Sequence, residues 1–212
     1  MRGKRIVRRS LGALVCGASL AGAALVSTAL PGAAAGSRVT DAPDGFSLIL
    51  PGQWHEVALS GSDIGALLGN AAKDDKAIDQ AAIQQALNEE KKGLKFFAFS
   101  STPEDNGNFF PNMNVGIYQG SAPASLLDAQ AKIELTQIGA HAIRVTQVSY
   151  PSGRAVEATY TIALNPTTTL YGTQVYTEHA GSVYIATFTA GEKAVEAKAA
   201  ATVMPSWRFT KK

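Results

Sequence analysis

The chain is poor in the residues that support the commonest covalent and metal chemistry. Among its 212 residues it has one cysteine, Cys16, and three histidines. Cys16 falls in an N-terminal stretch that we expect to be removed, which would leave no disulfide, no thiol nucleophile and no cysteine ligand. His55, His141 and His179 stand at none of the spacings typical of zinc ligands. We therefore expect neither a metal site nor another cofactor.

Basic charge of the kind that binds nucleic acid is also scarce. The whole chain carries a net charge of +2, but five of its 19 Lys and Arg residues lie within the first nine positions. Without them, 14 basic residues remain against 17 acidic ones, a net charge of −3. No basic patch with interleaved aromatic residues remains, so we expect no nucleic-acid binding.

Residues 1–35 have the pattern of an export signal. A basic start precedes an apolar stretch at 11–30, no acidic residue occurs before Asp41, and Ala33 and Ala35 offer small side chains to a signal peptidase. We expect cleavage after Ala35 and a secreted or cell-envelope location. An uncleaved membrane anchor is the alternative, because the apolar stretch is nearly long enough to span a bilayer. The choice between a Sec and a twin-arginine signal stays open.

The remaining sequence predicts a polar linker at 36–44 and one α+β domain at 45–210. Strands are expected at 45–50, 54–57, 94–100 and 112–119, helices at 74–90, 125–138 and 192–203, and a four-strand meander at 141–150, 154–164, 170–178 and 183–189. A mostly antiparallel sheet flanked by helices, an α/β/α sandwich, follows from this order.

Three details of the elements are specific enough to check. Ser125 and Asp128 have the spacing of a capping box at the start of the second helix. Along that helix, Asp128, Lys132 and Glu134 are expected to be solvated charges. A bulge at 146–147 would reconcile the two alternation phases of the first meander strand.

Short motifs resemble PsbP-like domains. They are a first strand that ends in Pro51 and Trp54, a meander closed by a helix, and the terminal Ser206-Trp207-Arg208-Phe209. The hairpin at 150–155 and the Ala-rich leader are similar to those of LpqN-type exported lipoproteins of actinobacteria. Val15 before Cys16 does not fit a lipobox, so lipid anchoring stays open. The resemblance implies a binding or accessory module without a shared catalytic site.

Apolar residues in segments expected to be loops are the candidate binding site. An exposed apolar patch often marks an interaction surface. These residues would rim a groove for an envelope protein or an apolar small molecule: Ile64, Leu67, Leu68, Phe109, Phe110 and Met113. The alternative is that they cap the core beneath a long loop.

Catalytic patterns are weak. No serine stands in a Gly-x-Ser-x-Gly motif. Glu157 and Glu178, on two meander strands, would form a carboxylate pair if they faced the same surface, as glycoside hydrolysis requires. We therefore expect a non-enzymatic exported module, with a hydrolase of envelope polymers or lipids as the alternative. In this interpretation the meander is a scaffold and the site lies on the loops before it.

Overall fold

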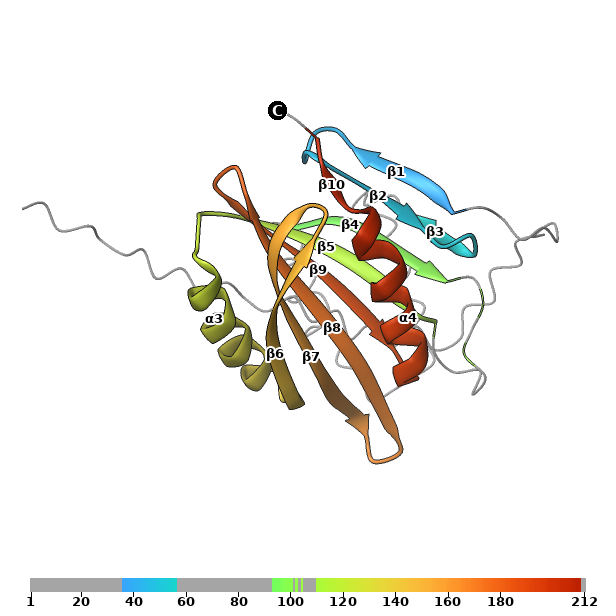
Figure 1. Ribbon diagram of the computed structural model, residues 1–212. Helices are drawn as coiled ribbons and strands as arrows, with labels where there is room; N and C mark the ends of the chain where they lie inside the picture. Colours follow the sequence, from blue (N-terminus) through green and yellow to red (C-terminus); the bar gives the residue numbers. More distant parts are fainter. Residues whose placement is uncertain (1–35, 57–92, 101, 103, 105–109, 211–212) are drawn as a thin grey trace, which may run out of the picture.

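A seven-stranded antiparallel sheet forms the middle layer of the molecule (Figure 1). The computed structural model describes residues 36–56, 93–100, 102, 104 and 110–210. In this part of the chain the strand order is β3-β4-β5-β9-β8-β7-β6. The bounds are Trp54–Glu56 for β3, Leu94–Ser100 for β4, Asn112–Gln119 for β5, His141–Tyr150 for β6, Gly153–Asn165 for β7, Thr168–His179 for β8 and Ser182–Ala190 for β9.

A second, three-stranded sheet lies over one end of the large sheet (Figure 1). It consists of β1 (Ser37–Asp41), β2 (Phe46–Leu50) and β10 (Arg208–Phe209), with β2 in the middle and both neighbours antiparallel to it. The predicted linker at 36–44 is therefore wrong over Ser37–Asp41. These residues form a strand because β2 offers a free backbone edge, and because Val39 and Thr40 have branched side chains that suit a sheet.

The two faces of the large sheet carry separate apolar cores, since side chains alternate along each strand. The face that we call the α4 face packs against helix α4 (Lys193–Val203) and the small sheet. The opposite α3 face packs against helix α3 (Ala124–Gln137). The α4 face includes Phe96, Met113, Val115, Val175, Ala186 and Phe188, and the α3 face includes Val156, Ala158, Tyr160, Tyr176, Val183 and Ile185. The predicted α+β class, a mostly antiparallel sheet with helices on it, is confirmed.

Helix α3 begins one residue earlier than predicted and without the expected capping box. Its N-cap is Pro123, and no side chain caps the first turn. Asp128 instead pairs with Lys132 one turn on, with 2.6 Å between Oδ1 and Nζ. Glu134 is the larger correction: it is 5% exposed and lies among the buried residues of the helix, not on a solvated face.

The predicted bulge at 146–147 is also wrong. There β6 pairs regularly with β7, and the irregularity lies between His141 and Arg144. Both alternation phases are real, because this edge strand contributes to both cores. Val145 packs against the α3 core, and Val148 against the α4 core. The predicted helix at 74–90 lies outside the described residues.

Aromatic rings join the two sheets. The indole of Trp207 stacks on the ring of Phe46, with 4.9 Å between ring centroids and 11° between ring planes. The edge of Tyr184 meets both rings. Trp207 is 2% exposed and follows the 3-10 turn η1 (Met204–Ser206), which continues α4. No helix in the described residues is long and apolar enough to span a membrane.

Truncation of Trp207 tests this junction. We expect Trp207→Ala to lower the free energy of unfolding by about 3–5 kcal/mol, because a large buried aromatic side chain leaves a cavity. The measurement is urea unfolding followed by circular dichroism. The half-buried Phe209→Ala should cost clearly less, and equal effects of the two changes would contradict a central role for Trp207.

Candidate functional site

The predicted apolar groove is not assembled from the residues that the structure describes. Ile64, Leu67, Leu68 and Phe109 lie outside the described residues. Phe110 is half-buried just before β5. Met113 has no exposed surface and belongs to the core on the α4 face, so its prediction as a groove residue is wrong. Strand alternation on β5 places Met113 on the α4 face, opposite Phe188 of β9.

A cavity of about 580 Å³ lies instead between α4 and the α4 face of strands β6, β7 and β8. We call it the α4 groove. Helix α4 packs on β8 and β9, and the cavity lies along its flank toward β6 and β7. One wall is the helix side formed by Lys193, Glu196, Ala197, Ala200 and Ala201, and the other is the sheet surface formed by Arg144, Tyr150, Glu157, Thr159, Thr161, Tyr171 and Thr173.

The groove stays open because the helix wall is built from small side chains. Ala197, Ala200 and Ala201 line it, and an alanine reaches only one carbon atom beyond the backbone. Larger apolar residues at these positions would fill the space, as they do in close-packed protein cores. On the sheet wall, β7 contributes the short side chains of Thr159 and Thr161 beyond Glu157.

A pair of carboxylates faces this space. Glu157 of β7 lies opposite Val175 of β8, and therefore on the α4 face. The hydroxyl of Tyr150 donates a hydrogen bond of 2.5 Å to Oε2 of Glu157. Burial raises the pKa of Tyr150, and the hydrogen bond that it donates to Glu157 raises this pKa further, so the phenol keeps its proton.

Glu196 of α4 is the second carboxylate, and it is 5% exposed. Burial raises its pKa, and the nearby charge of Glu157 raises it further, while the hydroxyl of Thr173 and the charge of Lys193 act in the opposite direction. Its Oε1 is buried without a hydrogen-bond partner. A buried acceptor left unpaired costs about 1–3 kcal/mol, so this atom is a natural contact for a ligand.

The predicted pairing of Glu157 with Glu178 is wrong, because the two side chains lie on opposite faces of the sheet. Glu178 is three residues beyond Val175 on β8, which places it on the opposite face from Glu157. It is exposed there. The missed partner, Glu196, carries a signal in the sequence: it precedes the buried residues Ala199 and Ala200 by three and four positions, and such residues share one helix face.

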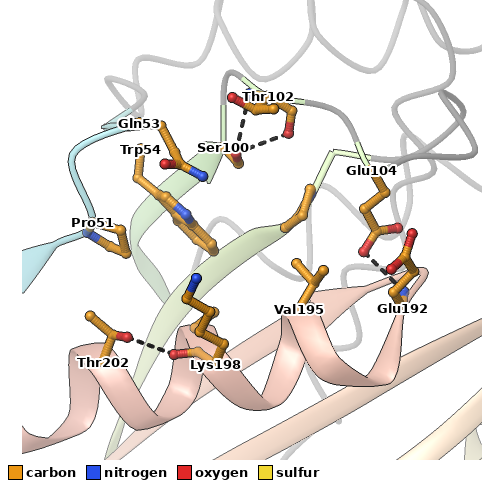
Figure 2. A pocket seen from close by; sticks show the side chains of 12 residues that line it. Pro51, Gln53, Trp54, Ser100, Thr102, Glu104, Glu192, Val195, Lys198 and Thr202 are labelled. Atoms are coloured by element: carbon orange, nitrogen blue, oxygen red, sulfur yellow. Dashed lines mark hydrogen bonds between the residues drawn. The ribbon is translucent and has the colours of Figure 1, made fainter. Parts of the chain in front are cut away.

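A second, smaller hollow of about 260 Å³ lies on the other flank of α4 (Figure 2). Figure 2 shows Trp54 of β3 and Lys198 of α4 on facing sides of it. At one end, the carboxylate of Glu104 accepts hydrogen bonds from the backbone N–H groups of Gly191 (2.8 Å) and Glu192 (2.9 Å). Burial raises the pKa of Glu104, although these two bonds oppose the rise. These two bonds tie a distant part of the chain to the residues immediately before α4.

A third polar group lies on the α3 face, beneath α3. Nε2 of Gln130 donates to Oε1 of Glu134 at 2.8 Å, and the hydroxyl of Tyr176 donates to Oε1 of Gln174 at 2.5 Å. Burial raises the pKa of Glu134 to about 7. The described residues contain no group of three or more acidic, histidine or cysteine side chains placed to hold a metal ion.

Comparison with known proteins gives similarity in fold only. No protein-family model and no curated protein matches the chain. The crystal structure of LpqN, involved in cell envelope biogenesis of Mycobacterium tuberculosis, is 12% identical with a TM-score of 0.48, covering 83% of this chain and 86% of LpqN. The solution structure of cyanobacterial PsbP (CyanoP) from Synechocystis is 14% identical with a TM-score of 0.48, covering 87% of this chain and 98% of that one.

A crystal structure from Bacteroides thetaiotaomicron is 12% identical with a TM-score of 0.49. The match covers 84% of this chain but 49% of that protein, so the chain spans about half its length. The LpqN and CyanoP structures bear the names of the two groups that the sequence motifs resemble, and each of these matches has a TM-score of 0.48.

The buried carboxyl of Glu134 makes a prediction about pH. Because its pKa rises from 4.5 in the unfolded chain to about 7 in the folded one, the folded state holds a proton that the unfolded state has lost. Stability should therefore fall as pH rises from about 4.5 to about 7. Glu134→Gln, which carries no charge, should flatten part of this fall in urea titrations at a series of pH values. Glu104 and Glu196 act in the same direction and leave a residual slope. A variant with the slope of the unchanged protein would contradict the assignment.

Proposed function

We propose that this chain is an exported, non-enzymatic binding or accessory module of the cell envelope, and that its ligand site is the α4 groove. Export is supported by the leader pattern at residues 1–35. The binding role is supported by an open cavity whose lining combines charged, hydroxyl and small apolar side chains. Its volume of about 580 Å³ falls in the range of small-molecule sites, roughly 300–1,000 Å³.

The observation that carries the proposal is the unpaired Oε1 of Glu196. A buried carboxylate in a helix costs stability, and replacement by an apolar residue of similar size often stabilises a protein. Thr173 of β8 hydrogen-bonds one oxygen of this carboxylate, but the second oxygen, Oε1, has no partner, and the other buried residues of the helix are Ala199, Ala200 and Val203. A ligand that donates a hydrogen bond to this Oε1 removes the cost of leaving it buried and unpaired. We accordingly infer a polar ligand rather than the apolar molecule expected from the sequence.

Filling the groove tests this proposal. We expect Ala201→Trp, at an exposed helix position that lines the groove, to abolish ligand uptake without disturbing the core. The measurement is native mass spectrometry of the purified protein after incubation with a small-molecule extract of the cell envelope and gel filtration. The matched control is Ala194→Trp, an exposed position on the same helix that does not line the groove. An adduct that survives Ala201→Trp, or the absence of any adduct, would overturn the proposal.

A hydrolase remains the second candidate, now with Glu157 and Glu196 as its carboxylates. The observation in its favour is their unequal surroundings: Glu196 is buried with a raised pKa, as suits a general acid, whereas Glu157 is half-buried and accepts a hydrogen bond from Tyr150. Carboxyl groups whose environments differ in this way divide the acid and base roles in many hydrolases.

Isosteric substitutions separate this candidate from a binding module. If the chain hydrolyses a nitrophenyl glycoside or ester, Glu157→Gln and Glu196→Gln should each lower kcat by about 10²–10⁴, the usual contribution of a general acid or base. Glu178→Gln, an exposed glutamate on the opposite face, is the control and should keep full activity. Activity unchanged in both groove variants would remove the hydrolase at this site.

A further inference from the structure

We propose that the ligand of the α4 groove is a small zwitterion, which places an ammonium group between Glu157 and Glu196 and an anionic group beside Arg144 and Lys193. The inference rests on the proposed function of the groove and specifies the chemistry of its ligand. The carboxylates lie in the inner part of the groove and the cations lie at its rim.

The inner part of the groove offers one buried acceptor that lacks a donor, Oε1 of Glu196. Thr173 supplies one hydrogen bond to the carboxylate of Glu196, and Oε1 remains unpaired. Tyr150 supplies one hydrogen bond to Oε2 of Glu157. An ammonium group brings three donors and a positive charge, so it satisfies the unpaired oxygen and offsets the repulsion between two nearby carboxylates. A neutral hydroxyl would satisfy the oxygen alone.

The aromatic rings of the groove favour the same group. Tyr150 and Tyr171 both line the sheet wall, on either side of the β7 residues that face the space. Each is half-buried, so part of its ring remains accessible. Cations bind favourably over tyrosine faces, by about 0.5–1 kcal/mol at exposed sites.

The rim supplies the complementary charge. Arg144 and Lys193 line the groove and are exposed. Neither belongs to the two ion pairs found among the described residues, Lys95–Asp44 and Lys132–Asp128. Arg144 lies opposite Thr159, two residues from Glu157 on the neighbouring strand, which corresponds to about 7–8 Å between diagonal partners. A ligand with its two charges separated by a short chain fits this spacing.

Three probes of equal length separate the two charges. They are 6-aminohexanoate, which has both, hexylamine, which lacks the anion, and hexanoate, which lacks the cation; 1,6-hexanediol is the neutral control. The measurement is a titration of the ¹⁵N-labelled protein followed by amide shifts, including those of Gly172 and Thr173. We expect the groove amides to shift with 6-aminohexanoate most strongly, with hexylamine more weakly, and with hexanoate or the diol not at all.

Substitutions then assign each charge. Glu196→Gln should weaken both amine probes by about tenfold or more, because an ammonium loses its buried partner. Glu157→Gln, at a half-buried position, is a second test of the ammonium position. Arg144→Gln should weaken 6-aminohexanoate and leave hexylamine unchanged. Glu178→Gln and Arg154→Gln, which do not line the groove, are the matched controls and should change nothing.

The outcomes distinguish this inference from the proposed function. Groove shifts with the diol or hexanoate, but not with the amines, would overturn the zwitterion and keep the groove as a site. Amine shifts that persist in Glu196→Gln and Glu157→Gln would overturn the ammonium position. If neither Arg144→Gln nor Lys193→Gln changes the binding of the amines, the ligand is a simple cation and the anionic position is overturned. No shift with any probe, together with no adduct in the extract experiment, would overturn both.

Discussion

The stacked rings of Phe46 and Trp207 are the contact on which the remaining architecture depends. Phe46 begins the middle strand of the small sheet, and Trp207 follows the turn that ends α4. Their stacking, with Tyr184 of the large sheet against both, joins three segments that are far apart in the sequence. Since α4 leads directly into this junction, its line over β8 and β9 is fixed at its C-terminal end. One wall of the groove is therefore positioned by an aromatic contact outside it.

The start of α4 is fixed independently by a carboxylate. Glu104 accepts hydrogen bonds from the backbone N–H groups of Gly191 and of Glu192, the N-cap residue, and so holds the segment that leads into α4. At the other end, Ser206 accepts the N–H of Ile49 and donates to the carbonyl of Val203. A helix held at both ends can pack loosely along one flank. This explains how a wall of alanines, which by itself contributes little packing, remains in place over an open cavity.

Much of the fold follows from patterns in the sequence, because alternation and turn residues act locally. The meander, α3, α4 and the terminal Trp207 segment were predictable for this reason. The small sheet was not, since β1 depends on a free edge of β2 that no local pattern reveals. The groove was missed on similar grounds. Charge alone favours a solvated position for Glu134 and for Glu196, although their spacing from Ala131 and from Ala199 places each on a buried helix face.

Strand parity and register explain why the carboxylate pair was assigned to the wrong residues. Within one strand, alternate residues lie on the same face, so their faces can be assigned from the sequence. Which residues of β8 share a face with Glu157 depends on the register of the two strands, and this register places Glu157 opposite Val175. The same register gives the meander strands a second face that is not part of the α3 core. Their α3 face is filled by Val156, Ala158 and Tyr160. Their other face lies beneath α4, whose alanine side chains are too small to fill the space. Because the α3 face of these strands supplies an apolar core, polar and charged side chains can occupy part of their α4 face without removing that core. The buried carboxylate of Glu196, whose Oε1 is unpaired, faces this side of the sheet from α4.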